Sequence, residues 1–203
     1  MAEMIDEDVA PLQRATNDMI RAFLRALDLH TSGERSHAMR VAVLSTATGH
    51  ELGLAGEDLL HLRWAAELHD VGKIGIDAAL LKRSGPLSED EMRSLRLHAL
   101  LAERVLESME WLGPAITLIR HHHERWDGRG YPDGLQGTAI PLGSRIIAVA
   151  EAFDAMTAGH ATRERWTEEQ ACRELRSCSG SQFDPTVVDA FCRVQPLVLP
   201  VES

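Results

Sequence analysis

Residues 121–132 read HHHERWDGRGYP, and this stretch decides how the rest of the chain is interpreted. Upstream, residues 69–73 read HDVGK. A His-Asp pair supplies one nitrogen and one carboxylate from neighbouring positions, and a carboxylate can bridge two cations. The side chains of His122 and His123 point in different directions on any regular backbone, so each can serve a different metal ion. The two stretches therefore predict a multinuclear metal site beside a Gly-Tyr-Pro loop.

The composition is that of one globular domain with a sizeable core: 203 residues, 44% hydrophobic and 26% charged. The formal net charge of −10 argues against a protein that binds nucleic-acid polymers by neutralising their phosphates. No apolar run reaches membrane-spanning length, and the acidic N-terminus is unlike a signal peptide, so we expect a cytoplasmic protein that contacts no membrane. The three cysteines include no Cys-x-x-Cys pair, which favours reduced packing thiols.

Apolar residues recur with helical spacing along nearly the whole chain, and no alternating strand pattern exceeds a few residues. Ser88 and Glu91 form an S-x-x-E capping box that opens a long helix to about Met109. The glycines and prolines between Asp127 and Pro141 predict a loop beside the histidine cluster. The sequence thus predicts an all-α fold, a single bundle of about eight or nine helices. The expected helices span about 1–30, 35–52, 57–69, 88–109, 114 to the histidine cluster, and 141–158, followed by two short helices that begin near 167 and 184.

Five histidines stand out because they lie on different predicted helices, apart from one adjacent pair. Helical bundles build multinuclear sites in this way, from inward-facing side chains on several helices. Glu151 and Asp154 add two carboxylates one turn apart on one helix face. A lone histidine on a helix is more often a surface or hydrogen-bonded core residue, so the joint pattern carries the prediction. The five are His37, His69, His98, His122 and His123, whereas His30, His50, His61, His121 and His160 keep the ordinary interpretation.

Four motifs occur in order: HDxGK at 69–73, HHExxDGxGYP at 122–132, AxxFDAMT at 150–157 and QFDP at 182–185. Together they resemble the HD-GYP family of cyclic-di-GMP phosphodiesterases, within the HD superfamily of metal-dependent phosphohydrolases. The resemblance divides the chain into an N-terminal helix at 1–30 and an HD-GYP-type phosphodiesterase domain at 31–203. It implies iron or manganese, although the ligand types alone leave zinc and nickel open. The implied ligands are His37, His69, Asp70, His98, His122 and His123, with Asp70 as the bridge.

Two positions depart from the family pattern. Glu151 stands where the family has its last aspartate ligand, and we expect it to bind a metal, with Asp154 as a partner behind it. Family members of a trinuclear type carry a glutamate four residues before the first histidine, where this chain has Gly33. Because we expect Glu34 on the wrong helix face, we expect two divalent metal ions.

The reaction that the resemblance implies is hydrolysis of cyclic-di-GMP to linear pGpG, and in some members on to GMP. The nucleophile is a hydroxide that bridges the metals. Asp70 and Lys73 are the expected catalytic residues, with Lys73 also supplying a cation to the phosphate of the substrate. Gly130, Tyr131 and Pro132 are expected to contact that substrate because their loop allows a close backbone approach and offers an aromatic ring.

Family members usually carry two basic residues after the AxxFDAMT helix that contact substrate. Arg163 matches the second of these, whereas His160 replaces the first and lacks the bidentate fork of an arginine. Weaker affinity or an altered nucleotide preference is the resulting hypothesis.

Two other functions stay open. In the first, Glu151 and His160 prevent turnover, and a catalytically weak or inactive module binds a signalling protein such as a diguanylate cyclase. In the second, the chain hydrolyses another nucleotide. A homodimer is also compatible with the sequence. Turnover of cyclic-di-GMP, measured against an Asp70→Ala variant, separates these functions.

Overall fold

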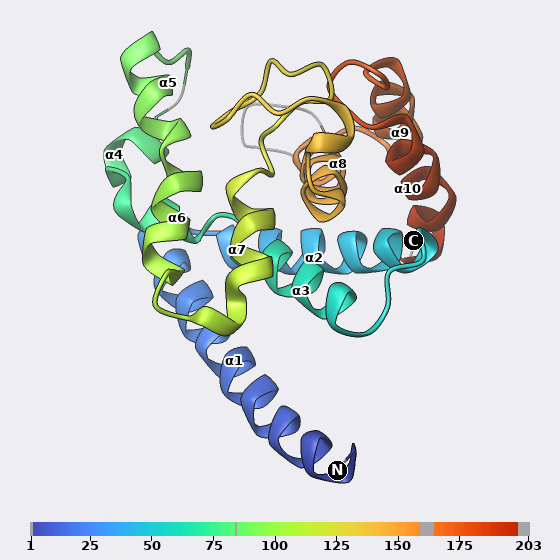
Figure 1. The fold of residues 1–203 in the computed structure, drawn as a ribbon. Helices are drawn as coiled ribbons and strands as arrows, with labels where there is room; N and C mark the ends of the chain where they lie inside the picture. Colours follow the sequence, from blue (N-terminus) through green and yellow to red (C-terminus); the bar gives the residue numbers. More distant parts are fainter. Residues whose placement is uncertain (1, 84, 159–164, 199–203) are drawn as a thin grey trace.

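The computed structural model describes residues 2–83, 85–158 and 165–198, and there the chain is helical (Figure 1). An isolated bridge between Ser179 and Phe183 is the only β pairing in this part of the chain. None of the described helices is long and apolar enough to cross a membrane. The predicted all-α fold is confirmed. The elements are α1 (Ala2–His30), α2 (Glu34–Glu51), α3 (Gly56–Leu68), the 3-10 helix η1 (Val71–Gly75), α4 (Ala78–Leu81), α5 (Glu89–Arg96), α6 (His98–Leu106), η2 (Glu110–Leu112), α7 (Gly113–Arg120), η3 (Gly137–Ala139), α8 (Leu142–Thr157), α9 (Glu168–Ser177) and α10 (Pro185–Val198).

Helix α2 is the centre of the bundle and packs against α1, α3, α8 and α10. Figure 1 shows α2 crossing the middle of the molecule, with α8 above it and seen nearly along its axis. Val41 and Leu44 of α2 are fully buried, and Phe153 of α8 belongs to the same core. Burial of these side chains is the main driving force for packing. The α2–α8 contact also sets the polar residues of the two helices side by side at one end of the core.

Helix α1 packs on the bundle with its second half and extends away from it toward the N-terminus (Figure 1). Ile20, Leu24 and Leu27 are buried. At the C-terminal end of α1, Nε2 of His30 donates a hydrogen bond to the backbone carbonyl of Ile76, at 2.9 Å. Helix α1 is thereby tied to the segment that follows η1. The domain boundary at residue 30 stays a prediction.

The expected helix from Ser88 to about Met109 is instead two helices, α5 and α6, with a break at Leu97. The predicted capping box forms: the Ser88 hydroxyl accepts from the Glu91 N–H and the Glu91 carboxylate accepts from the Ser88 N–H. Helix α6 begins at His98 where η1 crosses it, and a Cβ atom on Gly72 of η1 would lie 1.9 Å from the His98 carbonyl oxygen. Only glycine permits that approach. The break therefore places His98 directly beside the HDVGK segment.

Candidate metal centre

Six ligand-type side chains gather in two triplets inside the bundle. Within each triplet, one donor atom from every residue lies within 4.8 Å of the others. The side chains come from α2, the junction of α3 and η1, α6, and the segment that follows α7. All six were predicted from the sequence as ligands, and the structure brings them together. The first triplet is His37, His69 and Asp70, and the second triplet is His98, His122 and His123.

Three of these histidines are held in the same orientation. Nδ1 of His69, His98 and His122 lies 2.8, 2.7 and 2.6 Å, respectively, from the backbone carbonyl oxygen three residues earlier. A carbonyl oxygen only accepts, so Nδ1 carries the proton and Nε2 of the neutral ring carries a lone pair. Metal-binding histidines are commonly fixed by such a bond from their other nitrogen. The three rings are therefore oriented for ligation through Nε2.

The inward nitrogens have the arrangement that a cation requires. Nε2 of His69 is buried and has no hydrogen-bond partner among the described residues. Nε2 of His98 lies 3.4 Å from Nε2 of His122 and 3.1 Å from Nε2 of His123. Lone pairs at these separations repel each other unless a proton or a cation lies between them. Imidazole nitrogens combined with a carboxylate suit borderline divalent metals, so these residues fit a metal centre.

Burial keeps the rings of His122 and His123, in the second triplet, neutral. Burial, followed by the charge of His123, lowers the pKa of His122 well below its ordinary value. Burial, followed by the charge of His98, lowers the pKa of His123 to about 3. In the first triplet, burial lowers the pKa of His69, but the charge of Asp70, whose Oδ2 lies 3.2 Å from Nε2, outweighs burial and raises this pKa to about 9. A proton and a metal ion therefore compete for Nε2 of His69, whereas His122 and His123 offer unprotonated nitrogens.

Asp70 lies between the two triplets. Its Oδ2 is 3.2 Å from Nε2 of His69 and 3.9 Å from Nε2 of His37, whereas its Oδ1 is 3.6 Å from Nε2 of His98. Burial raises the pKa of Asp70, but the charges of Lys73 and His69 outweigh it and hold the pKa well below its ordinary value. An ionised carboxylate thus presents one oxygen to each triplet, and a carboxylate that bridges two cations needs this geometry.

Asp154 of α8 orients the first histidine. Its Oδ2 accepts a hydrogen bond from Nδ1 of His37 at 2.7 Å. Arg40, one turn after His37 on α2, donates from Nε and Nη2 to the two oxygens of Asp154 at 2.5 and 2.9 Å. Both oxygens are engaged, and Nε2 of His37 is left on the side of Asp70. The arrangement supports the predicted role of Asp154 as a partner behind a ligand.

The expectation that Glu34 lies on the wrong face of its helix is contradicted. Both carboxylate oxygens of Glu34 accept from Nζ of Lys73, at 3.1 and 3.2 Å, and the same Nζ is 2.6 Å from Oδ2 of Asp70. Glu34 is the first residue of α2, and it shares a face with His37 because positions i and i+3 of a helix are neighbours. Burial lowers the pKa of Lys73, but the charges of Asp70 and Glu34 outweigh it and raise this pKa above its ordinary value. Lys73 is therefore a permanent cation clamped by two carboxylates.

Glu151 of α8 lies between two hollows beside the triplets and lines both of them. A hollow of about 230 Å³ is also lined by His122, His123 and Phe183. A second hollow, of about 970 Å³, is lined by His37, Lys73 and Trp166 in addition to Glu151. The two hollows together are lined by residues of both triplets, and the charge of Glu151 acts to raise the pKa of both His69 and His122, so Glu151 lies near both triplets. It is not among the donors that lie within 4.8 Å of one another, and its ligand role stays a prediction.

Glu124, the last residue of the HHE motif, holds the Gly-Tyr-Pro loop rather than the histidine cluster. Its Oε1 accepts from the N–H groups of Asp133 and Gly134, at 2.7 and 3.0 Å, and its Oε2 accepts from that of Leu135 at 3.1 Å. The side chain is buried. A buried carboxylate bound by three backbone donors fixes the backbone conformation of the loop.

The loop packs directly on the ligand segment. A Cβ atom on Gly130 would lie 2.4 Å from the Arg125 nitrogen and 2.6 Å from the His123 carbonyl oxygen, so glycine is required for packing. The ring of Tyr131 stacks on that of His123, with centroids 4.8 Å apart. The Tyr131–Pro132 peptide bond is cis. The structure thus places Tyr131 against the second triplet, while substrate contact by Gly130, Tyr131 and Pro132 stays a prediction.

Two substrate-binding positions considered in the sequence, His160 and Arg163, lie outside the described residues. Sequence reasoning missed Arg40 and Glu124, which hold a ligand histidine and the loop. Arg40 could have been predicted from the sequence, since it follows His37 by three positions and so shares its helix face. Glu124 has only its place in the HHE motif, and its loop partners lie nine to eleven residues away.

Residues 21–187 match the HD domain family. The chain belongs to the HD domain family. It is 36% identical over 184 residues to the cyclic di-GMP phosphodiesterase response regulator RpfG of Xanthomonas campestris pv. campestris, covering 90% of this chain and 49% of that protein. It is 37% identical over 169 residues to the cyclic di-GMP phosphodiesterase of Thermotoga maritima, covering 81% and 45%. The chain therefore spans about half the length of these relatives.

The crystal structure of a cyclic GMP-AMP specific phosphodiesterase from Vibrio cholerae superposes with a TM-score of 0.69 at 22% identity, covering 87% of this chain and 48% of that chain. At this identity the likeness shows the fold. The HD-type bundle and the predicted resemblance are both confirmed. An HD domain is metal-dependent, and the two triplets are the side chains in the described part of this chain that can hold the metal.

Proposed function

We propose that this chain hydrolyses cyclic-di-GMP to linear pGpG with two divalent cations, one at each triplet. The observation that carries the proposal is the position of Asp70, whose two oxygens face different triplets. The names of the relatives from Xanthomonas campestris and Thermotoga maritima support the choice of substrate. Further cleavage of pGpG to GMP remains an expectation from the sequence.

Two cations bound here would supply a hydroxide nucleophile at neutral pH and neutralise charge on the phosphate under attack. Asp70 would hold both, and Glu151 would add a carboxylate from α8. Glu34 does not add a ligand for a third cation, because both of its oxygens already contact Lys73. We propose that the two ions are iron or manganese, since both elements accept imidazole and carboxylate ligands.

The remaining residues of the site orient the phosphate and keep charge balanced. Water adds to the phosphorus and the bond to the 3′ oxygen breaks, so the phosphate stays on the 5′ oxygen and the leaving oxygen takes a proton. Lys73, next to Asp70, places a permanent positive charge beside the phosphate. Burial, followed by the charge of Glu151, raises the pKa of Tyr131 above its ordinary value, so its hydroxyl keeps a proton that it can donate in a hydrogen bond.

A second substrate deserves a direct comparison, because a cyclic GMP-AMP specific phosphodiesterase has the same fold. 3′3′-cGAMP differs from cyclic-di-GMP in one base, whereas the phosphates and the chemistry are the same. The two triplets act on the phosphate and do not discriminate between the bases. Selection between the two nucleotides must therefore come from the residues that line the hollows.

The test is turnover of cyclic-di-GMP and of 3′3′-cGAMP by protein loaded anaerobically with Mn²⁺ or Fe²⁺, with products separated by chromatography. We expect pGpG from cyclic-di-GMP, no product from the Asp70→Ala variant, and unchanged rates for Asp58→Ala, an exposed aspartate on α3. Metal-loaded protein that turns over neither nucleotide would refute the proposal. Binding without turnover would favour the inactive module, and its docking of a diguanylate cyclase or of a second copy stays a prediction.

A further inference from the structure

Most cations near the two triplets are already neutralised by carboxylates. Lys73 is clamped by Glu34 and Asp70, and Arg40 is paired with Asp154. A cyclic dinucleotide carries two phosphates, and this chain has a net charge of −10. Binding such a ligand requires positive charge that is not already compensated. Cations held in these pairs do not supply it for a phosphate that lies away from the metal ions.

The cations of the Gly-Tyr-Pro side are compensated in the same way. Arg120 forms a bidentate pair with Asp133 at 2.9 Å and lowers the pKa of that carboxyl to about 2. Arg125 pairs with Asp127 at 2.8 Å. Neither guanidinium is free to turn toward a ligand without losing its carboxylate.

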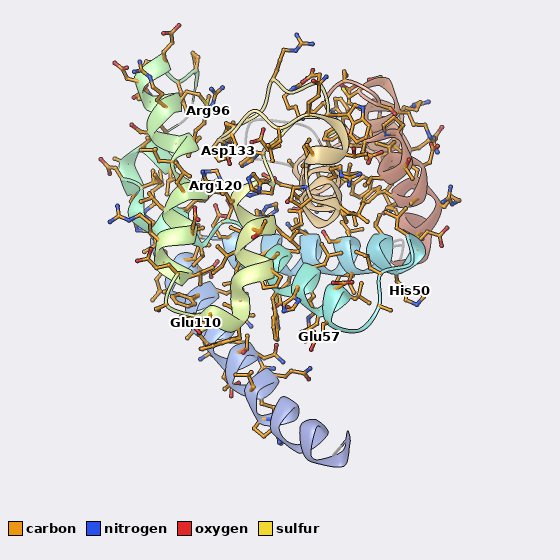
Figure 2. The ribbon with its side chains drawn as sticks, in the orientation of Figure 1. His50, Glu57, Arg96, Glu110, Arg120 and Asp133 are labelled. Carbon is orange, nitrogen blue, oxygen red and sulfur yellow. The ribbon has the colours of Figure 1, made fainter. Side chains whose placement is uncertain are left out.

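Arg96, the last residue of α5, is different. Its guanidinium carbon lies 5.1 Å from the centroid of the Tyr131 ring, and that ring stacks on His123 of the second triplet. Among the described residues no carboxylate lies within ion-pair distance of Arg96, and its side chain is exposed. Figure 2 shows Arg96 on the side of α5 that faces the loop carrying Asp133. An uncompensated cation therefore stands one aromatic ring away from the proposed metal ligands.

We propose that Arg96 binds the phosphate of the cyclic dinucleotide that is not being cleaved. This inference rests on the proposed function. With one phosphate at the triplets, the other must lie away from them, and Arg96 provides the charge beyond His123 and Tyr131. The ring of Tyr131 attracts the guanidinium to its face. When the face of the guanidinium lies on the ring, the N–H groups at its edge stay free. They can then donate a bidentate pair of hydrogen bonds to phosphate oxygens.

The contact between Arg96 and Tyr131 joins two separate parts of the chain. Arg96 ends α5, and Tyr131 belongs to the loop that Glu124 fixes. Arg165, which lines the larger hollow, also lacks a carboxylate partner among the described residues. However, it donates a hydrogen bond to the Ala158 carbonyl and lies between α8 and α9. Among the residues that the structure describes, Arg96 is therefore the arginine on the Gly-Tyr-Pro side that lacks a carboxylate partner.

Calorimetric titration with the bis-phosphorothioate analogue of cyclic-di-GMP, which resists hydrolysis, tests this inference on the metal-loaded full chain. We expect Arg96→Gln to weaken binding about tenfold, the equivalent of about 1.4 kcal/mol. Arg96→Lys should be intermediate, because it keeps the charge and loses the fork. Arg93→Gln is the matched control, since it removes the same charge from the same helix at a residue paired with Asp90. It should bind as the wild type does.

Inorganic phosphate, which carries only the group expected at the metal centre, is the second ligand. Its affinity should be the same in the wild type and in Arg96→Gln. Equal affinity of these two proteins for the analogue would overturn the inference, as would an equal loss for phosphate and analogue. A fall in thermal unfolding temperature without a change in affinity would assign Arg96 to a structural contact with Tyr131 and would also overturn it.

The two proposals fail in different ways. Wild-type protein that binds cyclic-di-GMP but does not hydrolyse it would refute the catalytic proposal while the comparison of Arg96 variants still holds. Wild-type protein that binds neither cyclic-di-GMP nor 3′3′-cGAMP would refute both.

Discussion

The two triplets of the centre have the same number of ligand side chains and very different surroundings. The first triplet contains Asp70 and is enclosed by ion pairs, with Asp154 and Arg40 on one side and Lys73 with Glu34 on the other. The second triplet consists of three imidazoles, and its outer neighbour is the aromatic ring of Tyr131. In the first region three carboxylates face the two permanent cations Lys73 and Arg40 before any metal enters, whereas the second triplet has three imidazole rings and no carboxylate of its own.

This difference indicates how two cations can be held by unequal sites. Asp70 belongs to the first triplet, and only its Oδ1 reaches toward the second. The negative charge that compensates the second cation therefore comes largely from a residue of the first site. Glu151, which lies near both triplets, is the other source. The second site should depend on the first more than the first depends on the second.

Asp70→Ala should have the largest effect, with loss of both metals and of turnover. Without this carboxylate the two cations repel each other and lose their shared ligand, while Lys73 loses one of its partners. Helix content should persist, because the apolar core does not involve Asp70. Elemental analysis, far-UV circular dichroism and turnover of cyclic-di-GMP are the measurements, with Asp58→Ala as control. Full turnover in the Asp70→Ala variant would contradict the assignment of the site.

His98→Ala should empty the second site and leave the first intact. The metal content should fall from two ions to one per chain, with turnover lost, because the first triplet keeps all of its ligands. The control is the exposed His50→Ala in the last turn of α2 (Figure 2), whereas the ligand residue His37 lies in the first turn of that helix. Anomalous scattering locates the remaining ion. An ion retained only at His122 and His123, or the loss of both ions, would show that the proposed order of dependence is wrong.

Much of this centre follows from the sequence because its residues lie in short motifs with fixed local geometry. His69 and Asp70 are adjacent, and His122 and His123 are adjacent, so local spacing was enough to assign them. His37 and His98 needed the family resemblance. The all-α fold followed from helical periodicity alone. The fold prediction is confirmed because helix formation and core burial depend on patterns that repeat every few residues, while metal binding by these side chains stays a prediction.

The parts that could not be predicted depend on contacts between distant segments. The break at Leu97 occurs where α6 meets Gly72, and no local signal near Ser88 indicates it. The i, i+3 spacing places Glu34 on the helix face of His37, but its partner Lys73 lies 39 residues away and could not be predicted. The Arg96–Tyr131 contact likewise joins two segments whose relative position is fixed only by the folded bundle. Helix geometry alone cannot supply such pairings.

Asp154→Ala and Glu151→Ala should separate a partner from a ligand. Asp154 holds His37 through its ring nitrogen, and loss of such a bond typically lowers metal affinity about 10- to 100-fold. This effect should be confined to the first site. Glu151→Ala should lower occupancy at both sites, because Glu151 lies near both triplets. Metal titration monitored by calorimetry is the measurement. Should Asp154→Ala strip the metals while Glu151→Ala leaves both sites filled, the roles of the two carboxylates are reversed.

Glu124→Gln should have the smallest effect on the metals and a clear effect on the loop of the second region. The amide oxygen can replace Oε1 as acceptor for Asp133 and Gly134, but the amide NH₂ then faces the Leu135 N–H, which loses its acceptor. Loss of a hydrogen bond to a charged group costs about 1.5–3 kcal/mol, so the unfolding temperature should fall by about 3–12 °C. Glu107→Gln, an exposed residue after α6, is the control. Because Glu124 touches no ligand nitrogen, the metal count should stay at two, while the KM for cyclic-di-GMP rises as Tyr131 loses its fixed position. Loss of metal in this variant would instead place Glu124 among the ligands.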